Sequence, residues 1–121
     1  MSKKDSGKKK VFKTAGQFQF KDMTLERQLE KARELIQAQN YQEDLQILHP
    51  LEERLSNRAD YNNLMGDAYF RLSDNLSAIF YFEKALPDLK ASQANLTRFH
   101  LAQSYLFAEY PALAYRNSKS R

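Results

Sequence analysis

Cysteine and tryptophan are absent from this chain of 121 residues, and glycine and proline occur only three times each. Without cysteine, the chain has no disulfide, no thiolate metal site and no cysteine nucleophile. The sequence also lacks an apolar run of about 18 residues, so it predicts no membrane-spanning helix. Its lysine-rich beginning has no apolar stretch of the kind found in a signal peptide. These absences predict a cytoplasmic protein.

Sequence motifs of catalysis are missing as well. The two histidines, His49 and His100, are far apart in the sequence, so neither has a second histidine nearby to complete a metal site. There is no glycine-rich phosphate loop and no Gly-x-Ser-x-Gly motif. We expect His49 at the surface and His100 in packing or in a polar contact. The sequence therefore predicts that the chain is not an enzyme and uses no metal, cofactor or small-molecule substrate.

Positive charge is concentrated at the beginning of the chain. Residues 1–22 hold seven lysines against two aspartates, whereas the rest holds 12 basic and 13 acidic side chains. Such a segment buries too little apolar surface to offset the entropy of ordering it, so we expect a flexible basic arm. The lysines that characterise the arm are Lys3, Lys4, Lys8, Lys9, Lys10 and Lys13.

Apolar residues recur at intervals of three and four from residue 25 onward, which indicates amphipathic helices. A first pair of helices is expected across residues 25–55, with Thr24 as its N-cap. Gln39 and Asn40 interrupt the apolar face and separate the two helices. Pro50 should kink the second helix, because its nitrogen cannot donate a hydrogen bond.

Two further helix pairs are expected after the first. The second pair covers residues 60–86, with Asp74 and Asn75 in its turn, and Pro87 ends its second helix. The third pair is expected to begin near Asn95. The whole pattern predicts an all-α fold.

Small and aromatic residues follow a defined spacing in the central pair. They occur in the order glycine, aromatic, alanine, aromatic and alanine, at Gly66, Tyr69, Ala78, Phe82 and Ala85. This spacing resembles the tetratricopeptide repeat, a helical hairpin of about 34 residues. The first and last pairs resemble it as degenerate copies. In the first pair, Asp44 stands where a small residue is expected.

The resemblance implies a domain across residues 23–121, with units at about 25–58, 59–92 and 95–121, following the arm at 1–22. Stacked hairpins share a core that one hairpin cannot form alone. We therefore expect a short right-handed solenoid of tetratricopeptide type.

The resemblance also implies a function. In this family the first helices of successive repeats line a concave groove that receives a partner peptide or helix, so the chain is expected to be a non-catalytic scaffold or adaptor. Aromatic, aliphatic and arginine side chains of the kind found at binding hot spots occupy the matching positions. The candidate groove residues are Arg33, Asn63, Asp67, Phe70, Arg71, Phe99, Gln103 and Phe107.

Other interpretations remain open at this point. A tighter superhelix or the N-terminal segment would cover some of the groove positions. The lysine arm would instead bind a nucleic acid, a ribosome or an anionic membrane, with an affinity that falls as salt rises. Residues 98–115 are similar to the last repeats before outer-membrane barrels in bacterial export systems, so the chain could be a fragment of such a protein. The sequence does not identify the partner protein, and it leaves self-association open.

Overall fold

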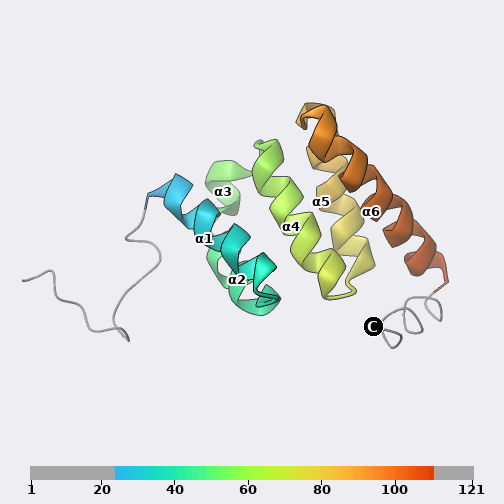
Figure 1. Ribbon diagram of the computed structural model, residues 1–121, viewed down its shortest axis with the longest axis horizontal. Helices are drawn as coiled ribbons and strands as arrows, with labels where there is room; N and C mark the ends of the chain where they lie inside the picture. The colour runs from blue at the N-terminus through green and yellow to red at the C-terminus, as the bar shows by residue number, and fades with distance from the viewer. Residues whose placement is uncertain (1–23, 111–121) are drawn as a thin grey trace, which may run out of the picture.

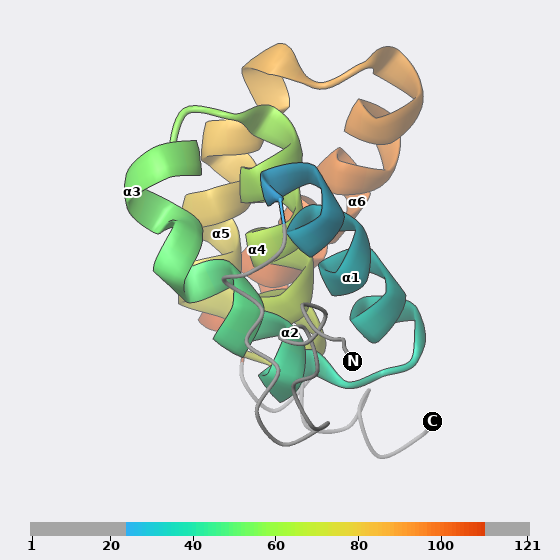
Figure 2. The same cartoon turned by 90° about the vertical axis from the view of Figure 1, so that its left-hand side faces the viewer.

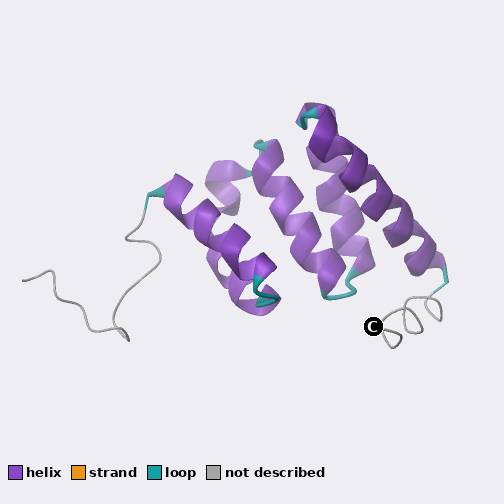
Figure 3. Cartoon of the chain, in the orientation of Figure 1, coloured by secondary structure: helices purple, strands orange, loops and turns teal. Residues whose placement is uncertain are grey.

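Helices are the only regular structure in residues 24–110, the part of the chain that the computed structural model describes (Figures 1 and 3). The predicted all-α fold is confirmed for this part. The lysine arm and the end of the third unit lie outside the described residues. The elements are α1 (Leu25–Gln37), α2 (Tyr41–Leu48), the 3-10 helix η4 (His49–Leu51), α3 (Glu52–Leu55), α4 (Ala59–Arg71), α5 (Asn75–Ala85), the 3-10 helix η5 (Leu86–Asp88) and α6 (Ala91–Glu109).

The helices form two layers. In Figure 1, α1, α4 and α6 lie in front of α2, α3 and α5, and Figure 2 shows α3 and α5 on one side and α1 and α6 on the other. Helix α1 packs on α2, α4 packs on α5, and α5 also packs on α6. Contacts of α2 with α4 join the first hairpin to the second. The chain thus passes back and forth between the layers.

The first two hairpins repeat with a period of 34 residues. Both bounds of α1 recur 34 residues later as the bounds of α4, and the first residue of α2 is followed at the same interval by the first residue of α5. Gln39 and Ser73, also 34 apart, both have a φ of 66° in the left-handed region. The residue after each donates its N–H to the carbonyl five residues back, Asn40 to Leu35 at 2.8 Å and Asp74 to Tyr69 at 2.9 Å. The two helices α1 and α4 therefore end in the same Schellman-type turn.

Capping and proline chemistry account for most helix ends. The Thr24 hydroxyl accepts a hydrogen bond from the Arg27 N–H at 3.1 Å, which confirms the predicted N-cap of α1. The kink predicted at Pro50 is the 3-10 helix η4, between α2 and α3. Pro87 likewise lies in η5, and α5 ends two residues before it, at Ala85.

Two of the predicted boundaries need correction. Asn75 is the first residue of α5, and the turn before it uses Ser73 and Asp74, whose carboxylate caps α5 by accepting from Ser77 N–H at 3.3 Å. Helix α6 begins at Ala91, earlier than the predicted start near Asn95. Once η5 has ended, none of the four residues that precede Asn95 is a glycine or proline that would delay the helix.

The core lies between the layers. Leu29, Leu48, Tyr61 and Met65 are among its fully buried side chains. Gly66 allows α5 to approach α4 closely, because a Cβ atom at this position would lie 2.5 Å from Cδ1 of the buried Phe82 ring. The spacing that suggested the resemblance therefore corresponds to a real helix-to-helix contact.

Candidate functional site

Four of the eight candidate groove residues line two adjoining hollows on the layer formed by α1, α4 and α6. The α1–α4 hollow has a volume of about 290 Å³ and is lined by Arg33, Ile36, Gln37, Gln39, Leu64, Asp67 and Arg71. The α4–α6 hollow has a volume of about 210 Å³ and is lined by Asn63, Asp67, Arg71, Phe82, Gln93, Leu96, Thr97 and His100. The hollows share Asp67 and Arg71, so these two residues stand between them.

An ion pair forms the boundary between the hollows. Arg71 Nε lies 3.0 Å from Asp67 Oδ1, one helical turn earlier in α4. Burial disfavours the charged guanidinium, but the charge and hydrogen bond of Asp67, together with the Tyr41 hydroxyl, outweigh it and raise the pKa of Arg71 above its ordinary value. Arg33 reaches the same surface from α1, with its Nη2 atom 3.9 Å from Asp60 Oδ2. Each hollow therefore offers hydrogen-bonding and charged groups beside apolar ones. The apolar groups include Leu64 in the α1–α4 hollow and Leu96 in the α4–α6 hollow.

Contacts between α4 and α6 use two of the candidate residues. The Thr97 hydroxyl donates a hydrogen bond to Asn63 Oδ1 at 2.8 Å. The ring of Phe70 stacks on the ring of His100, with centroids 4.6 Å apart and planes at 26°. Asn63 and Phe70 thus hold α6 in place, and Phe70 is only partly open to a partner. Burial lowers the pKa of His100, so its ring is neutral at pH 7.

The three candidates on α6 do not line either hollow. Phe99 is 58% exposed, whereas Gln103 and Phe107 are half-buried. The structure therefore divides the candidate set: Arg33, Asn63, Asp67 and Arg71 come together, and the α6 residues lie along a separate surface. Thr97 is not among the predicted site residues, although its spacing from Ala94 and Ser104 marks the α6 face that turns inward.

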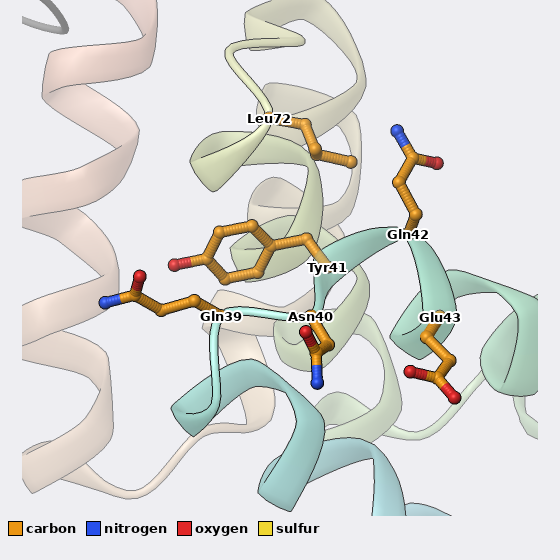
Figure 4. Close-up of a pocket in the computed structure, with 6 residues that line it drawn as sticks. All are labelled: Gln39, Asn40, Tyr41, Gln42, Glu43 and Leu72. Carbon is orange, nitrogen blue, oxygen red and sulfur yellow. The ribbon is translucent and has the colours of Figure 1, made fainter.

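A third hollow, of about 340 Å³, lies at the turn between α1 and α2 and contains none of the candidate residues. It is lined by Gln39, Asn40, Tyr41, Gln42, Glu43 and Leu72. Figure 4 shows that the polar ends of Gln39, Gln42 and Glu43 point in different directions. Because they do not converge, they do not form a site that could fix a small ligand.

A tyrosine cluster lies around Glu52, where α3 and α5 of one layer meet α4 of the other. The hydroxyls of Tyr61 and Tyr81 each lie 3.0 Å from Glu52 Oε1, and the Tyr69 hydroxyl lies 2.8 Å from Nε2 of the exposed His49. Burial, followed by the hydrogen bond to Glu52, raises the pKa of Tyr81 to about 12. These phenols stay protonated at neutral pH, and the hydroxyls of Tyr61 and Tyr81 can donate to Glu52. The cluster fastens α3, α4 and α5 together.

Within residues 24–110, no group of three or more histidine, aspartate or glutamate side chains is arranged to hold a metal ion. None of the helices described here has the length and apolar character needed to cross a membrane. No family model, curated protein or solved structure matches the chain. Of the three hollows described above, the two on α4 are those lined by candidate residues.

Proposed function

We propose that the chain is a non-catalytic protein-binding module of the tetratricopeptide type, which acts as a cytoplasmic scaffold or adaptor. The partner segment, a peptide or helix, lies on the α1–α4 hollow and extends to the α4–α6 hollow. The observation that carries the proposal is that Arg33, Asn63, Asp67 and Arg71, chosen as groove residues from the sequence, line two adjoining hollows.

The repeat of the backbone supports the tetratricopeptide assignment. The period of 34 residues between the first two hairpins equals the length of that repeat, and it appears in the helix bounds and in the turns. The contact of Gly66 with Phe82 supplies the close helix approach that the family's small residues permit. We infer a stack of hairpins in which α1, α4 and α6 are the first helices.

The composition of the hollows indicates what kind of partner they bind. Leu64 and Ile36 provide an apolar floor, and the guanidinium groups of Arg33 and Arg71 stand beside it. A segment with aliphatic anchors and carboxylate or carbonyl groups at intervals matches this surface, because arginine donates several hydrogen bonds in a fixed geometry. The Asp67–Arg71 pair would set the register of the segment by rejecting misplaced charges.

Site-specific photocrosslinking in the source cell tests the proposal. A photoreactive residue in place of Gln37, which is exposed at the α1–α4 hollow, should capture a defined protein. The same residue in place of Phe80, which is exposed on α5 in the opposite layer, is the control and should not capture that protein. Equal labelling from both positions, or none from Gln37, would contradict the proposal.

A charge-matched pair of variants sharpens the test. Arg33→Ala with Arg71→Ala should lower the crosslinking yield from position 37 by about tenfold, because arginine is frequent among binding hot spots. Arg27→Ala with Arg54→Ala removes the same charge from elsewhere on the molecule and should leave the yield unchanged. A similar loss in both double variants would indicate a nonspecific electrostatic effect instead.

A further inference from the structure

Helix α6 turns its small side chains inward and its large apolar side chains outward. The residues it buries are Ala94, Thr97 and Ser104. Leu96 and Phe99 are each 58% exposed, and Tyr110, which follows the helix, is 54% exposed. In Figure 1, α6 lies at the end of its row, with α4 and α5 on one side of it only. The helix therefore carries a second contact surface that its neighbours in the described part of the chain do not cover.

Four exposed residues and the half-buried Gln103 form a stripe with the spacing of a helix-packing seam. Starting at Leu96, they follow one another at intervals of three, four, three and four residues, which is the a/d spacing of paired helices. We call this set the α6 stripe, and its members are Leu96, Phe99, Gln103, Leu106 and Tyr110. It contains no charged side chain, and Gln103 at its centre is its only amide. Such a stripe is suited to packing against another helix.

We propose that the α6 stripe binds the α6 stripe of a second copy of this chain, with the two helices antiparallel. A two-fold axis at Gln103 places Leu96 opposite Tyr110 of the other copy and Phe99 within one residue of its Leu106. The two Gln103 amides then face each other, and each can donate to and accept from its mate. The stripe is complementary to itself, as the interface of a two-fold dimer must be.

The charges beside the stripe fit the same arrangement. Arg98 and Glu109 lie on one flank of α6, near opposite ends, and neither forms an ion pair within residues 24–110. The axis at Gln103 brings Arg98 of one copy within one residue of Glu109 of the other, on facing flanks. In a parallel arrangement each charge would instead lie at the level of the same charge in the other copy, and Arg98 would not approach Glu109. Charge complementarity therefore favours an antiparallel second copy as the occupant.

The size of the stripe predicts a weak association. A large aromatic side chain buries about 150–250 Å² when it is fully covered, and the exposed members of the stripe have about half of that left to bury. Two copies would together bury roughly 1,000 Å², at the lower limit for a specific interface. We therefore expect dimers that dissociate on dilution. This inference goes beyond the proposed function, because only Leu96 of the stripe lines a hollow.

Cysteine crosslinking of the full chain tests the proposal directly, since the sequence has no cysteine of its own. Gln103→Cys should form an intermolecular disulfide on mild oxidation at least tenfold faster than Leu76→Cys, because the two-fold axis brings only position 103 next to its copy. Leu76 is 74% exposed on α5 and is the matched control. Leu96→Cys should crosslink to Tyr110→Cys in a mixture faster than either variant crosslinks to itself. Equal rates for positions 103 and 76 would overturn the proposal.

Sedimentation velocity of the unsubstituted chain gives a second readout that depends on no variant. The average mass should rise from monomer toward dimer over about two orders of magnitude in concentration. Phe99→Glu should abolish the rise while the helical circular dichroism stays constant, and Leu76→Glu should leave it unchanged. A chain that remains monomeric throughout overturns the proposal. The occupant of the stripe would then have to be residues 111–121 or a different protein. That result would leave capture at the α1–α4 hollow untouched.

Discussion

Asp44 of α2 places a carboxyl group in the interior without a compensating partner. The residue is fully buried, and neither carboxylate oxygen has a hydrogen-bond partner among the described residues. Burial, with a smaller contribution from the charge of Asp67, raises the pKa of Asp44 to about 7. A small residue is expected here from the repeat pattern, so the carboxyl group is a destabilising feature at neutral pH.

The pH dependence of stability follows from the raised pKa. In the unfolded chain the Asp44 carboxyl has its ordinary pKa of 3.8, so between that value and about 7 the folded state keeps a proton that the unfolded state has released. The contribution of Asp44 to the free energy of unfolding therefore falls as pH rises through this range and is constant above it.

We predict that Asp44→Asn stabilises the protein by about 2–3 kcal/mol more at about pH 8 than at about pH 5, because the cost of keeping Asp44 in the interior grows with pH until its folded-state pKa of about 7 is passed. Urea unfolding at the two pH values measures the difference. Glu43→Gln, one residue away and exposed, is the control and should show no such pH-dependent gain. If Asp44→Asn gave the same change at both pH values, Asp44 would be ionised throughout.

At the scale of the elements, the break in the helix at η4 is coupled to the packing of α4. Pro50 has no N–H, and the chain tightens here into the 3-10 form, in which the Glu52 N–H bonds to the His49 carbonyl. The Tyr61 hydroxyl, carried by α4, lies 2.8 Å from the Leu48 carbonyl oxygen and can donate to it. One side chain thus ties the backbone at the break to α4 and joins the first hairpin to the second.

We predict that Tyr61→Phe lowers the free energy of unfolding by about 1–2 kcal/mol, because it removes a buried hydrogen bond while keeping the packed ring. Tyr81→Phe is the control: its hydroxyl is partly exposed and bonds to Glu52 only, so the loss should be about half as large. Chemical denaturation of both variants measures the losses. Equal losses would indicate that the Glu52 bond, shared by both hydroxyls, outweighs the bond to Leu48.

At the scale of the whole molecule, charge and shape are separated along the chain. The lysine excess belongs to residues 1–22, whereas the two hollows belong to α1, α4 and α6. Binding by lysine to phosphate releases counterions and weakens steeply with salt. A surface with apolar groups and partly buried ion pairs is much less sensitive to salt.

We predict that binding of the full chain to single-stranded DNA occurs only at low salt and disappears when the chain starts at Met23. Partner capture from position 37 should persist in the shortened chain and at about 0.3 M salt. Filter binding and the crosslinking yield measure the two activities. DNA binding that survives the removal of residues 1–22 would move the nucleic-acid site onto the helices.

Features that depend on near neighbours in the chain could be predicted. The Thr24 cap, the kink at Pro50 and the end of α5 before Pro87 follow from the chemistry of single residues and their hydrogen bonds. Half of the candidate site was also found from the sequence, since helical spacing places Asn63, Asp67 and the residues near them on one face. The start of α6 was missed because the stretch before it has no strong boundary signal.

Helix type, helix order and the 34-residue spacing were thus determined by the sequence alone, because backbone hydrogen bonds and apolar periodicity act over a few residues. Only the tertiary structure decided that Asp44 is buried without a partner, that His100 covers Phe70, and that α6 leaves its larger apolar face open. Each of these depends on which helix lies opposite, and that pairing joins residues about 20 to 35 positions apart along the chain.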